Sequence, residues 1–286
     1  MRGADPRIVL GLHRSRHQRA LLTGALDLGV TVLDTSSNYL GFRSHEVLAR
    51  VAGDLLPKFS ISTKVGYFPT TGRSQRPPGP ARLRAAVERA VDELGREPDL
   101  VFLHNPEHTL AGAASPLDRD RLEGACAALD AAATKGLCGA WGVATWDPSP
   151  LVGLVDADLP RPSVLMVRAG LLVGARTLDA AEALIAAWGL TGHEVWGMSP
   201  FGGLARAPVW DKFNPGAFLR GVDRLSRVQA AFRVAYALPR VCALAVGTDE
   251  VAHLGELRDA LTSEPDEDVV RAYRDLIRER AGGQSG

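Results

Sequence analysis

Four polar residues stand out because each lies at, or shortly after, the end of a short apolar segment. Asp34 ends the segment TVLD, and Tyr39 follows five residues later. Lys64 ends FSISTK, and His104 ends LVFLH. An isolated buried carboxylate or ammonium costs several kcal/mol, so Asp34 and Lys64 on neighbouring strands are expected to pair. If the segments are adjacent parallel strands, the four side chains converge at one edge of the sheet.

This set of residue types supports proton transfer to or from a carbonyl or hydroxyl oxygen. A free tyrosine titrates near 10, too high for efficient proton exchange at neutral pH. An ammonium within about 4–6 Å favours the tyrosinate, so we expect Lys64 to lower the pKa of Tyr39 while Asp34 keeps Lys64 charged. His104 can donate to, or accept from, the substrate oxygen beside Tyr39. The chemistry requires no metal ion.

A structural ion pair is the alternative interpretation of Asp34 and Lys64 taken alone. Tyr39 and His104 at the same edge favour the catalytic one. The sequence contains only four lysines, so a lysine at the end of an apolar strand calls for a reason of its own.

The elements that must position these residues alternate along the whole chain. Apolar runs rich in β-branched residues are typical of parallel strands covered on both faces. We expect strands at 7–12, 31–34, 59–64, 99–104, 137–143, 163–167, 194–199 and 241–246. The amphipathic segments that predict helices are 18–28, 45–52, 81–94, 118–135, 150–155, 178–188, 224–238 and 251–261.

Eight strand–helix pairs in succession predict an α/β fold, a (β/α)8 TIM barrel forming a single domain over residues 1–286. A doubly wound open sheet is the alternative, although no GxGxxG follows the first strand. Residues 264–286 are expected to form a C-terminal surface helix and tail. Long loops at 66–80 and 201–223 follow strand ends, where barrels build active sites. Aromatic candidates for lining a pocket there are Tyr67, Phe68, Trp146, Trp210 and Phe213.

Composition excludes several classes of function. The chain has 33 basic residues (lysine and arginine) and 33 acidic ones (aspartate and glutamate), so its formal net charge is zero. It therefore lacks the excess of basic residues that is typical of nucleic-acid-binding proteins. No apolar run reaches the roughly 18 residues that span a bilayer, and the charged start does not resemble a secretory signal. Three cysteines fit no metal-ligand spacing. We expect a cytoplasmic protein acting on a small molecule, in an oligomeric state that remains open.

The motifs around the four polar residues resemble those of the aldo-keto reductase superfamily. The segment DTSSNYLG at 34–41 resembles the DTAxxYG signature, and further similar motifs follow in order: SISTKVG, FLHNPE, WGVATW, SPFGGLA and VGTDEVAHLGEL. The resemblance covers nearly the whole chain and implies hydride transfer between NADPH and a carbonyl substrate. It implies that Tyr39 is the general acid/base, that Lys64 and Asp34 tune it, and that His104 positions the substrate oxygen.

The resemblance also indicates cofactor positions, where this sequence departs from the family. Around the nicotinamide the family has Ser-Asn, Gln and an aromatic residue; here these positions are Ala144-Thr145, Met166 and Met198. Each lost hydrogen bond weakens the orientation of the ring by about 1 kcal/mol. Candidates for the phosphate and adenosine end are Ser199, Phe201, Gly203, Gly247, Thr248, His253 and Glu256.

Asp249 lies near where the family often has Ser, Arg or Lys facing the 2′-phosphate of NADPH. A carboxylate beside a phosphate is repulsive, so NADH becomes an alternative to NADPH. Arg14 and Arg16, in the loop after the first strand, either hold a phosphate or are simply solvated.

Two enzymatic functions remain open at this point. The first is an oxidoreductase that reduces an aldehyde or ketone with NADP(H) or NAD(H). The alternative is a cofactor-independent lyase or isomerase that uses the same four residues for acid/base chemistry. A purely binding role gives no reason to keep a charged residue inside the third strand.

Overall fold

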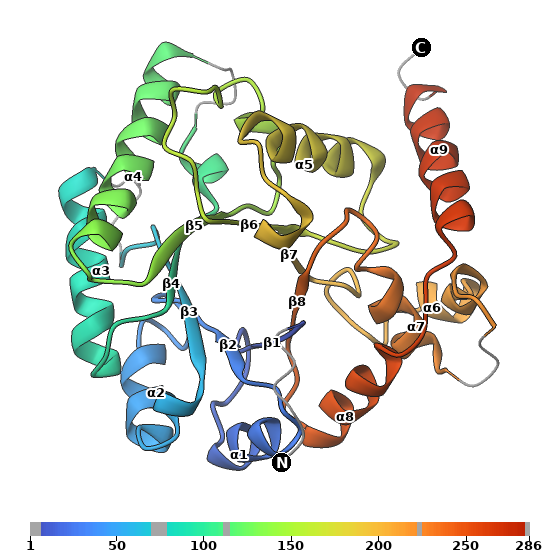
Figure 1. Ribbon diagram of the computed structural model, residues 1–286, viewed down its shortest axis with the longest axis horizontal. Helices are drawn as coiled ribbons and strands as arrows, with labels where there is room; N and C mark the ends of the chain where they lie inside the picture. The colour runs from blue at the N-terminus through green and yellow to red at the C-terminus, as the bar shows by residue number, and fades with distance from the viewer. Residues whose placement is uncertain (1–6, 70–78, 111–114, 222–224, 284–286) are drawn as a thin grey trace.

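The computed structural model describes residues 7–69, 79–110, 115–221 and 225–283. Eight parallel strands close into a barrel in sequence order, with helices packed around it (Figure 1). The predicted barrel is confirmed, and a doubly wound open sheet is excluded. The strands are β1 (Ile8–Gly11), β2 (Val32–Asp34), β3 (Ser60–Val65), β4 (Leu100–His104), β5 (Ala140–Ala144), β6 (Val164–Arg168), β7 (Val195–Met198) and β8 (Ala243–Val246).

The helices follow the strands as expected, except that no α-helix forms at 150–155 and that the short helix α6 (Val209–Lys212) forms within the predicted loop 201–223. They are α1 (Arg19–Asp27), α2 (Ser44–Ala52), α3 (Pro80–Leu94), α4 (Pro116–Thr134), α5 (Ala175–Ala187), α6 (Val209–Lys212), α7 (Arg227–Val234), α8 (Val251–Ala260) and α9 (Glu267–Gly283). The helix predicted at 150–155 is wrong: only a single 3₁₀ turn forms, at Ser149–Leu151. Pro148 and Pro150 lie in the first turn, where proline is tolerated. Beyond Leu151 the chain continues as a turn through Gly153, a residue that disfavours helix.

Side-chain alternation along the strands separates the inside of the barrel from the helix-covered outside. In β4, Leu100 and Phe102 belong to the inner cluster of apolar residues, whereas Val101 and Leu103 belong to the main core beneath the helices. The same period of two places His104 at the mouth, one step beyond Phe102. Strand alternation therefore decides which polar side chains reach the open end of the barrel.

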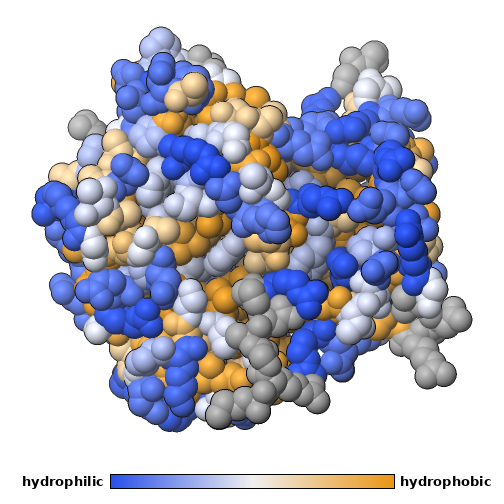
Figure 2. All heavy atoms as spheres, viewed as in Figure 1, coloured by the Kyte–Doolittle hydropathy of each residue, from blue (hydrophilic) through white to orange (hydrophobic). Residues whose placement is uncertain are grey.

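The C-terminal helix α9 forms as predicted, and it packs more firmly than a simple surface helix. Its Arg274 is buried and donates to Asp179 at 2.7 Å and to Glu182 at 3.1 Å, both on α5. The α9 side of the molecule is otherwise largely hydrophilic (Figure 2). The last residues of the predicted tail, 284–286, lie outside the described residues.

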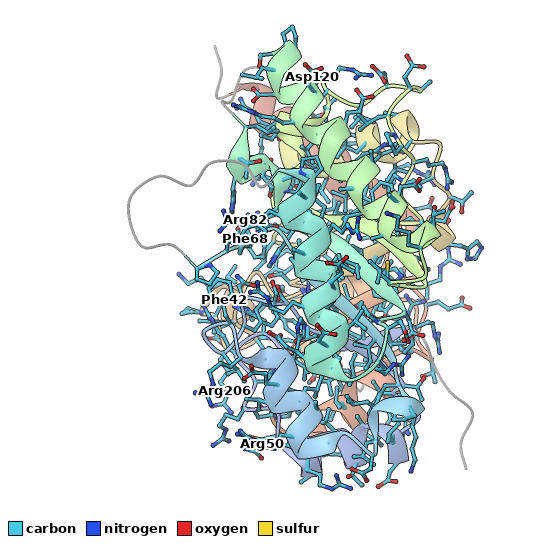
Figure 3. All side chains as sticks on the ribbon, turned by 90° about the vertical axis from the view of Figure 1, so that its left-hand side faces the viewer. Phe42, Arg50, Phe68, Arg82, Asp120 and Arg206 are labelled. Atoms are coloured by element: carbon cyan, nitrogen blue, oxygen red, sulfur yellow. The ribbon has the colours of Figure 1, made fainter. Side chains whose placement is uncertain are left out.

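The predicted loop 66–80 is described at 66–69 and from 79 onward, and residues 70–78 lie outside the described residues. Its two described ends contact each other. The guanidinium of Arg82, in the first turn of α3, lies 4.0 Å from the ring centre of Phe68. Figure 3 shows the two side chains next to each other. Within the described part of the chain, no helix is long and apolar enough to cross a membrane.

Gly142 in β5 provides a test of the barrel packing. An added Cβ would collide with the carbonyl oxygen of Val164 and lie 2.8 Å from the Phe102 ring. We expect Gly142→Ala to lower the free energy of unfolding by about 1–3 kcal/mol, as overpacking does. The measurement is the midpoint of urea denaturation. Gly255→Ala on α8, whose Cβ would meet Leu28 at 3.9 Å, is the matched control and should not destabilise. A midpoint for Gly142→Ala at or above wild type would contradict this packing.

Candidate active site

A cavity of about 700 Å³ opens at the carboxyl ends of the strands. This volume lies within the range of ordinary small-molecule sites. The four residues singled out in the sequence all line it: Asp34, Tyr39, Lys64 and His104. Four positions spread over 71 residues of sequence thus meet in one cavity, because parallel strands bring their carboxyl ends to the same face.

Lys64 is almost completely buried, and its ammonium is fully engaged. It forms an ion pair with Asp34 and donates to the backbone oxygen of Thr35 at 2.9 Å. The second oxygen of Asp34 accepts from Ser62 Oγ at 2.9 Å. Burial is the largest single influence and disfavours the ammonium, but Asp34 and Tyr39 together outweigh it, so the pKa of Lys64 is raised. Lys64 therefore remains a cation inside the barrel.

Tyr39 lies against this ammonium. Its hydroxyl oxygen is 3.5 Å from Lys64 Nζ, and Nζ is 5.3 Å from the centre of the ring. Burial nevertheless raises the pKa of the Tyr39 phenol, and Lys64 offsets only part of that increase. The expected influence of Lys64 is present, since its charge lowers this pKa, but desolvation disfavours the phenolate more than one ammonium favours it, so the net shift is upward.

His104 completes the group as a neutral imidazole. Burial, reinforced by the charge of Lys64, holds its pKa well below the ordinary value of 6.5. Its ring lies 6.4 Å from that of Tyr39 and 4.8 Å from that of Tyr67, both nearly perpendicular. A neutral imidazole has one ring nitrogen that donates and one that accepts, so its tautomer decides what it offers to a ligand.

Ser36 controls that tautomer, and the sequence analysis missed it. Its Oγ lies 3.1 Å from His104 Nδ1, 2.6 Å from the side-chain oxygen of Asn38 and 3.3 Å from the backbone oxygen of Lys64. The oxygens of Asn38 and Lys64 can only accept, so the Ser36 hydroxyl uses its one proton on this side, chiefly toward the nearer Asn38 oxygen. Ser36 Oγ is then left to accept a hydrogen bond from His104 Nδ1–H. The other ring nitrogen, Nε2, then carries a lone pair. The signature position is Ala in DTAxxYG and Ser here, and that departure was the available signal.

Further aromatic and polar side chains line the cavity close to Tyr39 and His104. Tyr67 and Trp146 line the cavity, as the sequence suggested, together with Asn105, which donates to Tyr67 Oη at 3.2 Å. His13, not predicted, also lines the cavity and lies 5.0 Å from the Tyr39 ring. The remaining aromatic candidates, Phe68, Trp210 and Phe213, are not among the lining residues. Trp210 and Phe213 instead pack into a second apolar cluster beside α7 and α9.

The side predicted for the nicotinamide is apolar. Met166 and Met198 line the cavity together with Ala144. Thr145 is completely buried and is not among the lining residues, and its hydroxyl has no hydrogen-bond partner. The side chains that line this wall therefore offer no hydrogen bond to a carboxamide.

The predicted phosphate end is part of the same cavity. Its lining includes Ser199, Phe201, Gly203, Gly247 and Thr248. Arg14 also lines this end and brings a cation to it.

The two residues predicted to hold the adenine lie outside the cavity. His253 and Glu256 are exposed on α8 and are not among the lining residues. His253 Nδ1 lies 3.1 Å from Thr248 Oγ1, which is its link to the cavity edge. Their role toward a ligand remains a prediction.

Asp249 ties the last strand–helix loop to the first. One carboxylate oxygen accepts from Ser15 Oγ at 2.9 Å and from the Arg16 backbone N–H at 3.3 Å. The other lies 3.4 Å from Arg16 Nε. Asp249 also lines the cavity, so its charge faces a ligand while these donors hold it in place.

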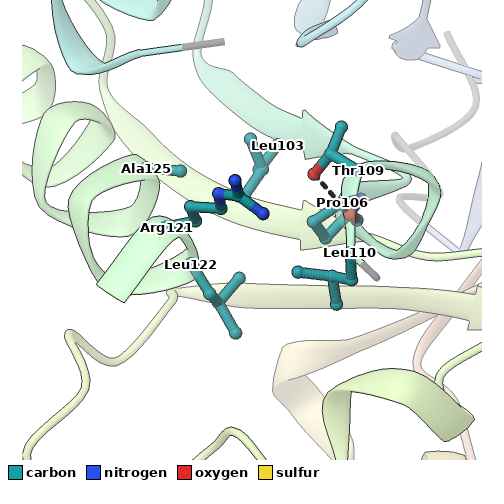
Figure 4. A pocket seen from close by; sticks show the side chains of 7 residues that line it. All are labelled: Leu103, Pro106, Thr109, Leu110, Arg121, Leu122 and Ala125. Carbon is teal, nitrogen blue, oxygen red and sulfur yellow. Dashed lines mark hydrogen bonds between the residues drawn. The ribbon is translucent and has the colours of Figure 1, made fainter. Parts of the chain in front are cut away.

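A second cavity lies behind β4 and has no chemistry of its own. It measures about 20 Å³, roughly the size of one water molecule, and lies between Leu103 and Leu122 (Figure 4). The nearby Thr109 hydroxyl already donates to the backbone oxygen of Pro106 at 2.8 Å.

Comparisons with known proteins identify the family and the fold of the chain. The Aldo/keto reductase family model matches residues 12–218. Comparison with curated proteins finds no match. An aldo-keto reductase from Bacillus halodurans in its holo form has a TM-score of 0.72 at 17% identity, covering 95% of this chain and 91% of that one. An aldo-keto reductase from Klebsiella pneumoniae in complex with NADPH has a TM-score of 0.66 at 17% identity, covering 95% of this chain and 91% of that one. Aldose reductase from Giardia lamblia has a TM-score of 0.67 at 15% identity, covering 96% of this chain and 93% of that one. At these identities the structural likeness establishes the fold.

Ser36→Ala tests the tautomer of His104. The change removes the acceptor for Nδ1–H, so we expect the ring proton to move toward Nε2 and its occupancy there to rise several-fold. The ¹⁵N chemical shifts of the histidine ring report both protonation and tautomer. Ser37→Ala is the control, since no hydrogen bond of the Ser37 side chain is found in the described structure. Unchanged ring shifts in Ser36→Ala would show that Ser36 does not set the tautomer.

Proposed function

The chain belongs to the aldo/keto reductase family, and we propose that it reduces the carbonyl group of a small molecule with a nicotinamide dinucleotide as hydride donor. The observation that carries this proposal is the buried Lys64 cation, held by Asp34 and placed 3.5 Å from the Tyr39 hydroxyl in a cavity of about 700 Å³. A structural ion pair does not require a phenol at its open end.

Tyr39 supplies the proton in this proposal. Because burial raises its pKa, the phenol is protonated at neutral pH and can donate to a carbonyl oxygen as that oxygen gains charge. Donation leaves a phenolate beside Lys64, whose positive charge stabilises it. Asp34 keeps Lys64 charged through the cycle, so the acid is restored by a proton from solvent. A bound nicotinamide would supply the hydride.

His104 is neutral and accepts a hydrogen bond, so it does not compete with Tyr39 as the proton donor. Its depressed pKa keeps it neutral, and the Ser36 contact leaves a lone pair on Nε2. An acceptor at this position suits the alcohol formed in the reaction, or a hydroxyl next to the carbonyl, better than a bare carbonyl oxygen.

The lining of the cavity supports a dinucleotide at its phosphate end. The same cavity contains Tyr39 and the turn at Gly247 and Thr248, and Arg14 adds a cation to its lining. A Klebsiella relative is known in complex with NADPH. Asp249 lines this end and carries a negative charge, which favours NADH over NADPH for this chain.

The apolar wall formed by Ala144, Met166 and Met198 favours a second candidate function. Without hydrogen-bonding side chains for the carboxamide, Tyr39 and Lys64 would perform acid/base chemistry alone, such as dehydration or isomerisation next to a carbonyl. Titration of the pure protein with NADH and NADPH by calorimetry separates the two functions. Absence of binding at millimolar concentration would exclude the reductase and leave the cofactor-independent enzyme.

Tyr39→Phe tests the proton donor. Removing the hydroxyl should lower turnover of aldehydes by about 10²–10⁴-fold, because proton transfer contributes that much to such reactions. Turnover is followed by the loss of NADH or NADPH absorbance. Dinucleotide affinity and the thermal midpoint should stay close to wild type, since the ring still packs. Full activity in this variant would remove Tyr39 from the role.

Asp249→Ser tests the cofactor preference. A unit repulsion of about 1 kcal/mol at roughly 4 Å in water corresponds to about a fivefold change in affinity. We therefore expect the Kd for NADPH to fall about fivefold relative to the Kd for NADH, measured by calorimetry. Ser15→Ala is the control, because it removes one of the contacts between the loops and keeps the carboxylate. An unchanged ratio in Asp249→Ser would show that the 2′-phosphate lies elsewhere.

A further inference from the structure

Arg168 is a cation at the mouth of the barrel that the proposed mechanism does not use. It ends β6, where Val164 and Met166 belong to the inner cluster while Leu165 and Val167 pack outward. Alternation therefore directs Arg168 inward, one step above Met166. Its register partner on β7 is Met198, which lines the cavity, as Met166 does.

The guanidinium of Arg168 has no polar partner in the described parts of the chain. Its Nε is buried without a hydrogen bond, and the side chain is only half exposed. Burial accordingly lowers the pKa of the guanidinium, and Asp147, the acidic residue that raises it, forms no ion pair with it. Buried donors of arginine are normally satisfied, so a partner from outside the chain would complete this site.

Trp146 holds the guanidinium at the cavity. The Arg168 guanidinium carbon lies 4.8 Å from the centre of the Trp146 ring, and Trp146 lines the cavity with 41% of its surface exposed. The backbone is fixed beneath it, because the buried carboxylate of Glu107 accepts from the N–H of Trp146 at 2.7 Å and of Asp147 at 3.1 Å. Glu107 thus positions the loop and is not an ion-pair partner of Arg168. The arginine therefore lies over an aromatic ring, and its donors have no partner among the described residues.

The cation nearest the reacting group cannot serve as an anion site. Lys64 is neutralised by Asp34, and Arg14 lines the cavity elsewhere. Arg168 itself is not among the lining residues, but it contacts Trp146, which is. Among the described residues of β5 and β6, Arg168 is therefore a cation at the cavity edge without an ion pair. A planar guanidinium matches a carboxylate with two parallel hydrogen bonds, and stacking on an aromatic ring reduces the freedom lost on binding.

We propose that Arg168, stacked on Trp146, binds a carboxylate on the substrate, so that the preferred substrates are aldehyde or keto acids. This deepens the proposed function and rests on it. The carbonyl group would meet Tyr39 while the carboxylate meets Arg168, since Tyr39 and Trp146 line the same cavity. The acid group selects the substrate and takes no part in the chemistry.

The experiment compares a charged substrate with a neutral one of the same shape. The probes are 4-carboxybenzaldehyde and its methyl ester, reduced with saturating NADH or NADPH. In the wild type we expect kcat/KM for the acid to exceed that for the ester about tenfold or more, as a charge-assisted bidentate pair provides. Arg168→Gln should abolish that preference, mainly by raising KM for the acid, and leave the ester within about twofold. Arg168→Lys, which keeps the charge but not the fork, should give an intermediate ratio.

Arg82→Gln is the matched control. It removes another arginine that lies over an aromatic ring, but that ring, Phe68, does not line the cavity, whereas Trp146 does. This variant should leave the ratio of kcat/KM for the acid to kcat/KM for the ester unchanged. The thermal midpoints of Arg82→Gln and Arg168→Gln should both stay at the wild-type value. An equal loss for both probes in Arg168→Gln, or no change in their ratio, would overturn the proposal. A rise in the dinucleotide Kd with an unchanged ratio would overturn it too, by assigning Arg168 to the phosphates of the cofactor.

Binding of the alcohols distinguishes this proposal from the reductase itself. Calorimetry compares 4-(hydroxymethyl)benzoate with benzyl alcohol on the wild type and Arg168→Gln, without turnover. If neither aldehyde is reduced but the benzoate binds more tightly and loses that advantage in Arg168→Gln, the anion site stands and the proposed reductase fails. If both aldehydes are reduced and the benzoate shows no advantage that depends on Arg168, the reductase stands and the anion site fails.

Discussion

The burial of one ammonium group governs the rest of the site. Lys64 lies inside the barrel with almost no access to water, so it must be neutralised by a neighbouring carboxylate, and Asp34 on the adjacent strand is placed to do so. Asp34 in turn needs Ser62 for its second oxygen. Burying this ion pair costs free energy, which indicates that the charge of Lys64 has a function. That charge acts on Tyr39 and His104, whose pKa values it lowers. The barrel provides the low-dielectric surroundings that make that charge effective.

The cavity has two unlike halves, and this difference defines the chemistry that it can support. The half formed by Tyr39, His104, Tyr67 and Asn105 is dense in donors and acceptors that already contact one another. The half formed by Met166 and Met198 offers shape without hydrogen bonds. A ligand is therefore oriented mainly through its reacting oxygen and through charged groups at the rim. Recognition at the rim is where this chain can differ from its relatives without changing the proton-transfer residues.

The barrel and the four polar residues could be predicted because both follow from local signals: apolar runs with a period, and single charges at their ends. The 150–155 helix failed because amphipathic spacing over a short segment was weighed above the cost of Gly153 in a helix. The upward pKa shift of Tyr39 was not predicted because it is a balance between burial and charge that only the packed structure fixes. Arg168 was missed because an arginine at a strand end is an ordinary residue until the structure shows which ring it contacts. Ser36 was missed although it departs from the Ala of the DTAxxYG signature, which was an available signal.

The barrel closes where β1 meets β8, so the beginning and the end of the folded chain share one seam. Asp249 and Ser15 bridge that seam at its open end, within the wall of the cavity. A ligand lying across it touches segments separated by more than two hundred residues and joins them directly. Its occupancy is therefore coupled to the integrity of the whole barrel, and ligand binding stabilises the entire fold by mass action instead of rigidifying one loop.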